Sequence, residues 1–383
     1  MPSNTMLSSE KISYWEQKSF FNNIDYLIIG AGIVGYSTAL HLRKANPNSK
    51  IVILERGFLP SGASSKNAGF ACFGSATELY ADLQEIPEKD VWETVKLRWE
   101  GLSHLRTLIG DQQLKFETNG SWDLITEHET SLFEKVKDQI PYFNTKLKEI
   151  TGEEGVYSID PNVSTKFGFN NVITSIFNRL EGQIDTASMN HAFYKKVIAE
   201  DIHVLFGIEA LSIDQNNVKT TQGTIQSTNI SICTNGFGKA LIPSEDIVPA
   251  RAQVLITEPI KNLKIKGTFH YNKGYYYFRN IDDRILFGGG RNLDIRGETS
   301  TLLENTALIT KSLNAILKNV ILPSTPFKID HQWAGIMGIG KSKKPIVKKL
   351  DDHLFCGLRL GGMGVAIGTL VGKELASLIQ ENK

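Results

Sequence analysis

Three glycines near the start of the chain, Gly30, Gly32 and Gly35, follow an apolar run and open a helical pattern in the spacing GxGxxG. Such a turn lets the backbone approach a pyrophosphate, and the helix behind it offers unpaired N–H groups to the phosphates. Glu55 ends the next apolar run, 20 residues beyond Gly35, where a carboxylate would accept hydrogen bonds from an adenosine ribose. Because this carboxylate would repel a 2′-phosphate, the pattern predicts an adenine dinucleotide other than NADP.

The segment 61–70, "SGASSKNAGF", is a second candidate binding element. Ser64, Ser65, Lys66 and Asn67 carry side chains that donate hydrogen bonds, and the small residues among them let the backbone wrap a large anionic ligand. A flexible polar loop has the same composition, so this segment taken alone leaves both interpretations open.

A third element lies near the end of the chain, where "LRLGGMGVAIGTLVGKELA" predicts a strand, a glycine turn and a helix. Together with GAGIVG and GASSKNAG it resembles the FAD-dependent oxidoreductases of the D-amino-acid oxidase type, which include glycine oxidase, sarcosine oxidase and γ-glutamylputrescine oxidase. The resemblance covers nearly the whole chain after about Ile24, because "PARAQVLITEP", "GYYYFRNIDDRILFGGG" and "HQWAGIMG" also follow in the family's order.

The resemblance implies a tightly held FAD. Its pyrophosphate would lie on the glycine turn, its ribose against Glu55 and Arg56, its adenine against the backbone of Ile208, and its flavin ring against the C-terminal glycine turn. Some members bind flavin covalently through Cys or His, but Lys66 stands at the matching position here, so non-covalent FAD is implied. The predicted cofactor-binding residues are Gly30, Gly32, Ile33, Val34, Gly35, Glu55, Arg56, Ser64, Ser65, Lys66, Asn67, Ala68, Gly69, Ile208, Gly236, Gly361, Gly362, Met363, Gly364 and Val365.

The segment 274–279, "GYYYFR", is the predicted wall of the substrate site. In a strand, Tyr276 and Phe278 share one face, and Tyr275, Tyr277 and Arg279 share the other. Tyr276 matches a substrate-contacting tyrosine of glycine oxidase, so the resemblance implies the same role for it, although aromatic strands usually serve packing alone. Other candidates for this wall are Arg279, His270 and Trp333.

One position departs from the family's pattern. Amino-acid oxidases of this type place an arginine at the end of a "WxGxR" turn, where its two parallel hydrogen bonds hold the substrate carboxylate, but Met337 stands there in "WAGIM". Either Arg359, at the mouth of the C-terminal glycine turn, takes over that role, or the substrate is an amine without an α-carboxylate. Tyr276 and Arg359 are therefore the predicted catalytic residues.

The resemblance implies oxidation of a small amine or amino acid, in which a hydride passes to the flavin and the resulting imine is hydrolysed. Oxygen or another acceptor would then take the electrons. Two alternatives stay open at this point, a 2-hydroxy-acid dehydrogenase with the same fold and a flavin-binding sensor without turnover, because fold does not determine function.

The overall composition is that of a soluble globular protein, with 41% hydrophobic and 22% charged residues. A formal net charge of +1 gives no reason to expect nucleic acid as a partner. The three cysteines, Cys72, Cys233 and Cys356, are spaced too widely for a CxxC metal site or a disulfide framework, so we expect reduced thiols, no metal and a cytoplasmic protein. No run is long and apolar enough for a transmembrane helix.

We predict an α/β protein in which a Rossmann-like FAD-binding domain is interleaved with an α+β substrate domain containing an antiparallel sheet. Residues 1–23 would form an N-terminal arm packed on the first domain, and a hairpin is expected around Asn119 and Gly120. The predicted FAD-binding domain comprises residues 24–90, 181–250 and 331–383, and the predicted substrate domain comprises residues 91–180 and 251–330.

Overall fold

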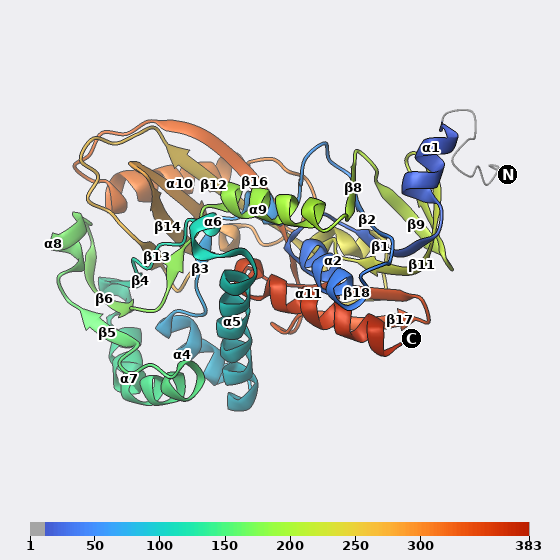
Figure 1. Cartoon of the computed structure of the whole chain (residues 1–383). Coiled ribbons are helices and arrows are strands. Elements are labelled where there is room, and N and C mark those ends of the chain that lie inside the picture. Colours follow the sequence, from blue (N-terminus) through green and yellow to red (C-terminus); the bar gives the residue numbers. More distant parts are fainter. Residues whose placement is uncertain (1–11, 383) are drawn as a thin grey trace.

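The computed structural model describes residues 12–382. Within this range the strands form two eight-stranded sheets and a two-stranded ribbon, accompanied by helices (Figure 1). The first sheet is built around parallel pairs, and the second is largely antiparallel. This arrangement confirms the predicted α/β fold class.

The predicted strand, helix and strand at the start of the chain form the centre of the first sheet. β1 (Ile24–Ile29) and β2 (Ile51–Glu55) pair in parallel, and α2 (Ile33–Ala45) connects them. The other strands of this sheet are β8 (His203–Phe206), β9 (Ala210–Asp214), β10 (Asn217–Thr220), β11 (Gly223–Ile232), β17 (Ile346–Asp351) and β18 (Leu354–Leu358). β8, β11 and β18 continue the parallel part, and β9, β10 and β17 pair in antiparallel fashion.

The alternation of side chains along β2 separates two hydrophobic cores. Ile51 and Ile53 face the core that contains α2 and α11 (Gly364–Glu381), whereas Val52 and Leu54 face the core shared with strands β10 and β11. A strand buried on both faces is typical of a parallel sheet covered on both sides.

Two glycines of α11 determine how closely α2 approaches it. A Cβ atom on Gly368 would lie 2.8 Å from Ile33 Cγ2, and one on Gly372 would lie 2.7 Å from the Val34 carbonyl oxygen. The two helices therefore touch almost backbone to backbone and lie side by side (Figure 1). Because the contacts advance together along both helices, the two N-termini lie at the same end of the sheet.

The strands of the second sheet are, in spatial order, β16 (Ile329–Ile339), β12 (Val248–Thr257), β15 (Arg284–Gly289), β14 (Tyr276–Ile281), β13 (Thr268–Tyr271), β4 (Ser121–Thr126), β6 (Val172–Asn178) and β5 (Tyr157–Asp160). Neighbours are antiparallel except β13 and β4. One face carries an aromatic core, in which the rings of Phe269 and Phe278 stack with centroids 4.7 Å apart. This core is covered by α8 (Val163–Phe167), α10 (Ala307–Ile316) and the π-helix Leu317–Ile321.

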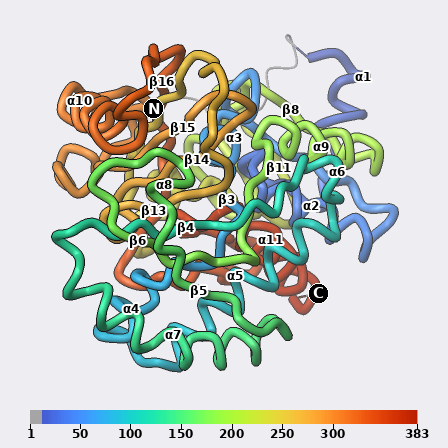
Figure 2. The backbone as a smooth tube through the Cα atoms, turned by 90° about the vertical axis from the view of Figure 1, so that its left-hand side faces the viewer, coloured from blue at the N-terminus to red at the C-terminus, as the bar shows by residue number. Residues whose placement is uncertain are grey.

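The remaining helices surround and connect the two sheets. Figure 2 shows α4 (Ala76–Glu85), α5 (Glu88–Ile109) and α7 (Thr130–Thr151) gathered at one end of the molecule. Searching residues 12–382, we found no helix that is both long and apolar enough to cross a bilayer. The other elements are α3 (Ala63–Lys66), α6 (Asp111–Leu114), α9 (Thr186–Ala199), the ribbon strands β3 (Phe70–Ala71) and β7 (Gly182–Gln183), and the 3₁₀ helices η2 (Glu127–Glu129), η3 (Asn235–Ala240) and η4 (Arg291–Leu293).

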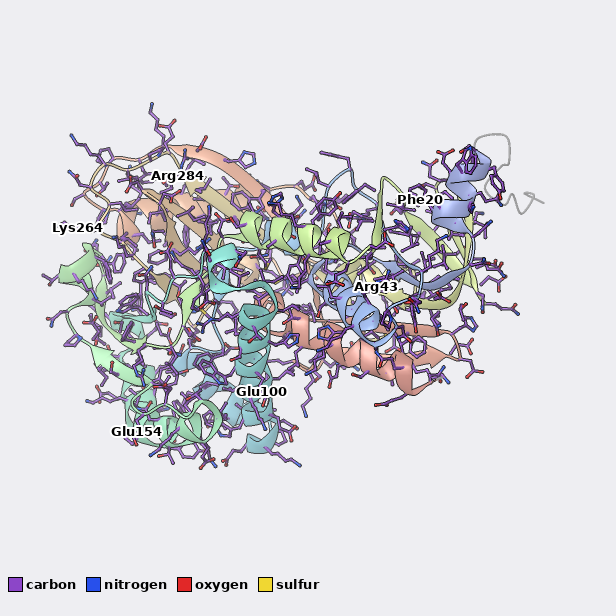
Figure 3. The ribbon with its side chains drawn as sticks, in the orientation of Figure 1. Phe20, Arg43, Glu100, Glu154, Lys264 and Arg284 are labelled. Atoms are coloured by element: carbon purple, nitrogen blue, oxygen red, sulfur yellow. The ribbon has the colours of Figure 1, made fainter. Side chains whose placement is uncertain are left out.

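Of the predicted N-terminal arm, the first eleven residues lie outside the described part of the chain. The rest contains α1 (Tyr14–Glu16), which continues as the π-helix Gln17–Phe21. Phe20, labelled in Figure 3, packs edge-on against His203 of β8, with ring centroids 5.1 Å apart. The described part of the arm therefore contacts the edge of the first sheet.

The division of the chain into two domains stays a prediction, and one strand that we assigned to the FAD-binding domain lies in the second sheet. β16 pairs with β12 along almost its whole length, from Ile329 to Ile339, so residues 331–339 belong to the second sheet and not to the first. An apolar run shows that a strand will be buried, but it does not show which sheet the strand will join.

The predicted hairpin around Asn119 and Gly120 is wrong. Gly120 does turn the chain, with a φ of 84°, but the residues on its two sides do not pair with each other. Glu117 bridges to Gln183, whereas β4 pairs with β6 and β13.

Candidate active site

A cavity of about 1090 Å³ is lined by residues of both large sheets. It begins at the glycine turn after β1, passes α3 and the start of α11, and reaches strands β13 to β16. Small-molecule sites usually measure about 300–1,000 Å³, so this cavity has room for a ligand as large as a dinucleotide.

The glycine turn has the geometry that its sequence predicts. Gly30 has a φ of 110°, and a Cβ on Gly35 would collide with the Gly30 carbonyl oxygen. Gly30 and Gly32 both line the cavity. The three glycines therefore make the turn, expose its backbone and let α2 start directly against the strand.

The first N–H of α2 points across the cavity to α3. Ile33 donates this N–H to Ser64 Oγ over 3.0 Å, and both residues line the cavity. A hydroxyl oxygen thus occupies a position where an oxygen of an anion would be favoured by the helix dipole.

Glu55 holds the loops around this turn together. One carboxylate oxygen accepts from the Ala31 N–H at 3.2 Å, and the other accepts from the Gly57 N–H at 3.0 Å and from Ser61 Oγ at 2.8 Å. Next to it, the Arg56 guanidinium lies 3.7 Å from the centre of the Phe237 ring. Glu55 and Arg56 line the cavity, and their contact with a ribose stays a prediction.

The polar residues after α3 mainly shape the backbone. The Asn67 side chain accepts from the Gly69 N–H at 2.8 Å and from Thr186 Oγ1 at 2.9 Å, and it donates to the Ser64 carbonyl. Trp333 donates its ring N–H to the Lys66 carbonyl over 3.0 Å and does not line the cavity, so this candidate wall residue is a support for α3.

The C-terminal glycine turn is fixed from two sides. The Leu360 N–H donates to Asn235 Oδ1 at 3.2 Å, and the Gly361 N–H donates to the Gly338 carbonyl at 2.9 Å. Gly361 has a φ of 58°. Helix η3, β16 and the start of α11 therefore form one continuous wall.

All but two of the predicted cofactor-binding residues line the cavity. Gly35 lies behind the turn, and Ser65 is exposed and donates its hydroxyl to the Pro60 carbonyl. The predicted cofactor-binding residues that line the cavity are Gly30, Gly32, Ile33, Val34, Glu55, Arg56, Ser64, Lys66, Asn67, Ala68, Gly69, Ile208, Gly236, Gly361, Gly362, Met363, Gly364 and Val365, and their contact with FAD stays a prediction.

Tyr276 lies on the wrong side of its strand for the predicted role. Its side chain is 4% exposed and belongs to the aromatic core under α10, where its hydroxyl lies 3.0 Å from Ser312 Oγ. Tyr275 and Tyr277 line the cavity instead. The alternation along β14 is as predicted, but the face that meets the cavity is the opposite one.

Arg359 lines the cavity, but its guanidinium is already paired. It donates to Asp246 Oδ2 at 2.8 Å and, through Nε and Nη2, to the Lys344 carbonyl. Met337, the residue that stands in place of the arginine expected from the WxGxR pattern, also lines the cavity. In this arrangement neither residue has two free N–H groups for a bidentate pair with a carboxylate.

A charged cluster on the cavity wall was not predicted. Arg98 of α5 donates to Glu78 Oε1 at 3.2 Å, and Lys343 donates to the same carboxylate at 2.9 Å and to Asp82 at 2.7 Å. Burial disfavours the charge on Glu78, but attraction to Arg98 and Lys343 outweighs it and lowers the pKa of Glu78 to about 2. No sequence pattern links these residues, because they come from α4, α5 and the loop before β17.

The cavity wall on the second sheet is aromatic. Phe70 packs edge-on against both His270 and Tyr277, with centroids 5.5 Å apart in each pair. Burial raises the pKa of Tyr277 to about 12 and lowers the pKa of His270 to about 4, so both side chains are uncharged near neutral pH.

Arg291, at the start of η4, was also missed. It lines the cavity and is partly buried. Among the described residues its Nε has no hydrogen-bond partner, and its Nη2 lies 3.5 Å from Thr299 Oγ1. Burial lowers the pKa of Arg291, against the opposing attraction of Glu298. The signal in the sequence is the glycine run "GGGR" at the end of β15, which brings the chain back toward the cavity.

Comparison with known proteins places these features in a family. A family model described as FAD dependent oxidoreductase matches residues 25–378. The chain is 21% identical to a probable oxidoreductase, OrdL, of Haemophilus influenzae, over 93% of this chain and 82% of that one. It is 22% identical to the gamma-glutamylputrescine oxidoreductase of Escherichia coli, over 93% and 83% of the two chains.

Solved structures share the fold. Glycine oxidase from Bacillus cereus matches with a TM-score of 0.73 and 17% identity, over 94% of this chain and 96% of that chain. L-Proline dehydrogenase from P. horikoshii matches with a TM-score of 0.71 and 19% identity, over 94% of each chain.

The cavity fits the cofactor of this family. Gly32 and Ile33 line it, Ser64 Oγ takes the first N–H of α2 where a phosphate oxygen would bind, and its volume suits a dinucleotide. We conclude that the chain belongs to the FAD-dependent oxidoreductase family related to D-amino-acid oxidase and that FAD is its cofactor.

Proposed function

We propose that the protein oxidises a small amine or amino acid. When bound, FAD would supply the acceptor for a hydride from the substrate carbon next to nitrogen; the nitrogen would lose a proton, and water would hydrolyse the resulting imine. One observation carries the proposal: the glycine turn after β1 and the aromatic wall on the second sheet line the same cavity. The relatives support it, because their names include a gamma-glutamylputrescine oxidoreductase, a sarcosine oxidase subunit and a glycine oxidase.

The residues of the cavity suggest how the cofactor would be held. The backbone around Gly32 and Ile33 would bind the pyrophosphate, with Ser64 giving up its hydrogen bond from Ile33 to a phosphate oxygen. The wall formed by η3, β16 and the start of α11 would contact the flavin. We keep non-covalent binding as part of the proposal.

The substrate side favours a molecule that carries a carboxylate as well as the amine. Met337 cannot bind an anion, and Arg359 is paired with Asp246. Arg291 keeps a buried Nε without a partner on the described part of the chain. A carboxylate would satisfy this donor, while Tyr277 and Phe70 would form the apolar wall beside the reacting carbon.

Flavin reduction tests the proposal directly. Purified protein should be yellow and should release FAD when it is denatured. Under anaerobic conditions, its flavin should be bleached by amines or amino acids such as sarcosine. Bleaching by 2-hydroxy acids alone would contradict amine oxidation, and no bleaching by any compound of either class would favour a sensor. Re-oxidation by dissolved oxygen would then identify an oxidase, and its absence would indicate another acceptor.

Paired substrates test the carboxylate. We expect sarcosine to bleach the flavin at lower concentration than dimethylamine, and Arg291→Met to raise the apparent KM for sarcosine by about 10- to 100-fold, the value of a charged hydrogen bond. The control is Arg284→Met, because Arg284 (Figure 3) begins β15, the strand that leads to Arg291, but does not line the cavity and pairs with Asp330. Equal use of the two amines by wild-type protein would contradict a carboxylate at Arg291.

The unpaired cysteines are all buried, and the thiols of Cys72, Cys233 and Cys356 have pKa values raised by burial. We keep a cytoplasmic location, inferred from the spacing of these cysteines, as a proposal. Localisation of a tagged full-length chain by cell fractionation would test it.

A further inference from the structure

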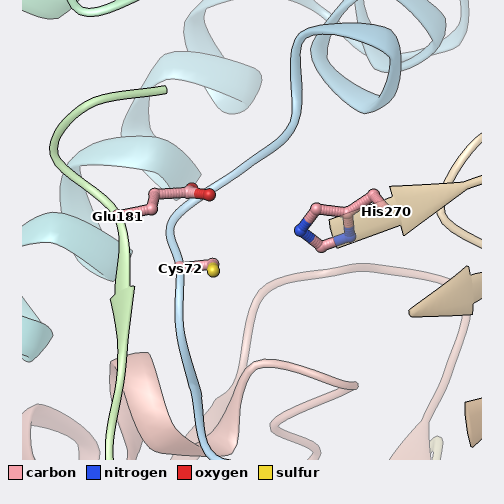
Figure 4. A group of neighbouring side chains, drawn as sticks. All are labelled: Cys72, Glu181 and His270. Atoms are coloured by element: carbon pink, nitrogen blue, oxygen red, sulfur yellow. The ribbon is translucent and has the colours of Figure 1, made fainter. Parts of the chain in front are cut away.

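Three side chains from distant parts of the sequence meet at the edge of the cavity. Cys72 follows β3, Glu181 precedes β7 and His270 lies in β13. One potential metal-binding atom of each, a sulfur, an oxygen and a nitrogen, lies within 4.8 Å of the other two. Figure 4 shows the three side chains pointing toward one another from three separate segments.

The carboxylate of Glu181 is buried and held in place from one side. Its Oε1 accepts from the Phe73 N–H at 2.7 Å and from the Gly74 N–H at 2.8 Å. Its Oε2 has no hydrogen-bond partner among residues 12–382. Two backbone donors thus orient the carboxylate and leave one buried oxygen unsatisfied.

One of the other two groups also lacks a partner. His270 Nε2 is buried without a hydrogen-bond partner in the described chain. Cys72 Sγ, 4% exposed as a residue, makes two hydrogen bonds at lengths usual for sulfur, 3.7 Å to Thr268 Oγ1 and 3.9 Å to the Gly182 carbonyl. Leaving two neighbouring buried polar atoms unsatisfied is costly, so a native structure rarely does so without a ligand or water there.

A divalent metal ion would satisfy these atoms together. Thiolate sulfur, imidazole nitrogen and carboxylate oxygen are the ligands that Zn²⁺ uses, at about 2.0–2.3 Å from the ion. A thiolate and a carboxylate balance the two charges of the ion, so the buried site would be neutral. Small side-chain rotations would bring the three atoms to the distances around a common ion.

We propose that Cys72, Glu181 and His270 bind Zn²⁺. Cys72 and His270 line the cavity, so the fourth position of the ion faces it and takes water or an anionic group of a ligand. Three protein ligands with one open position are typical of zinc sites that take part in binding or chemistry. We predicted no metal from the sequence, because positions 72, 181 and 270 form no recognisable metal-binding motif. The zinc proposal departs from that prediction.

Zinc titration of the FAD-loaded full-length protein tests the site. The protein is first dialysed against EDTA, and ZnCl₂ is then added in competition with a chromogenic chelator. We expect one ion per chain, and at the zinc absorption edge we expect one sulfur neighbour with the rest nitrogen or oxygen. Absence of binding, or bound zinc without a sulfur neighbour, would overturn the proposal.

Matched variants identify the ligands. Cys72→Ala and Glu181→Gln should each weaken zinc binding at least tenfold, roughly the loss seen when even supporting groups of a zinc site are removed. Cys356→Ala is the control, because Cys356 is a buried thiol of β18 that does not line the cavity. Circular dichroism and flavin absorbance verify folding. If Cys72→Ala does not fold, the wild-type absorption edge and Glu181→Gln decide the question, and unchanged affinity in Glu181→Gln would contradict the assignment.

Discussion

The side of the cavity near the glycine turn after β1 and the side near the second sheet differ in the groups that line them. The side proposed for the cofactor, which we call the cofactor side, includes the backbone of a glycine turn, with Gly30, Gly32 and the N–H of Ile33. The side proposed for the substrate, which we call the substrate side, includes Tyr277 and Arg291 from the second sheet and its loops.

This difference decides how each side responds to mutation. A backbone surface depends on a few positions where no side chain fits, so one added methyl group can destroy it. A side-chain surface depends on strand register and on distant supports, so its residues can be exchanged singly with smaller and more selective effects.

The largest expected effect is on the cofactor side. In Gly35→Ala, the new Cβ would collide with the Gly30 carbonyl oxygen, so α2 would have to move away from β1. We expect loss of bound FAD and destabilisation by roughly 3 kcal/mol or more, measured by flavin absorbance and urea unfolding.

Gly62→Ala is the matched control, because Gly62 also lines the cavity but a Cβ there meets nothing within 4 Å. Its φ of −84° is open to any residue. FAD content in Gly62→Ala should equal that of the wild type. Retention of FAD by Gly35→Ala would show that the turn is less constrained than its backbone contacts indicate.

The cofactor side could be predicted from the sequence because its signals are local. GxGxxG, the acidic residue that ends β2 and the glycine turn before α11 each lie within one strand, turn or helix. Their positions follow from short-range geometry. The direction of the Ser65 side chain, which donates to the Pro60 carbonyl, could not be predicted, because a short polar segment does not show which side of a helical turn faces the cavity.

The substrate side could be predicted only in part. The alternation along β14 was correct, but which face meets the cavity depends on α10 covering the other one. The pairing of Arg359 with Asp246, and the meeting of Cys72, Glu181 and His270, join segments that are far apart in sequence. Such contacts are set by tertiary packing and leave no local pattern.

The second largest effect concerns the support of the substrate side. Arg251 of β12 pairs with Glu298 in the loop that follows Arg291, through two hydrogen bonds of 2.9 Å, and both partners are buried. Arg251→Met would leave the Glu298 carboxylate buried without its partner. We expect a loss of about 3–5 kcal/mol in the free energy of unfolding, measured by urea denaturation.

The exposed pair of Arg106 and Asp111 provides the control for this prediction. Arg106 also donates two hydrogen bonds to the two carboxylate oxygens of its partner, at 2.8 and 2.7 Å, but both side chains are well exposed. Arg106→Met should cost less than about 1 kcal/mol. Equal losses in the two variants would mean that the loop carrying Arg291 is not held by its buried ion pair.

The stability of the protein should also depend on pH, through a buried aspartate of the second sheet. Asp123 of β4 is buried, and burial raises its pKa to about 6 against the opposing hydrogen bonds from Thr77. The folded protein therefore holds a proton that the unfolded chain, with its ordinary aspartate pKa of about 3.8, has released. This contribution to stability is complete below about pH 4 and is lost as the pH rises through 6.

Asp123→Asn removes this titration. Measured against the variant by urea unfolding at several pH values, the wild type should lose on the order of 3 kcal/mol between pH 4 and 7. A difference between the two proteins that stays constant with pH would show that Asp123 is ionised at its ordinary pKa.

The smallest expected effects separate the two faces of β14. Tyr276→Phe removes the hydrogen bond to Ser312 and should cost about 1 kcal/mol of stability without changing the KM of the amine substrate. Tyr277→Phe should leave stability within about 0.5 kcal/mol but shift KM, because it removes the hydroxyl of a side chain that lines the cavity. If Tyr276→Phe changed KM and Tyr277→Phe did not, β14 would present its other face to the substrate. That result would require β14 to slip by one residue relative to its neighbours, which would turn every side chain to the other face. The ring of Phe278 would then face the cavity, and Arg279 would be buried under α10. The free-energy cost of burying this charge exceeds what a substrate contact would return.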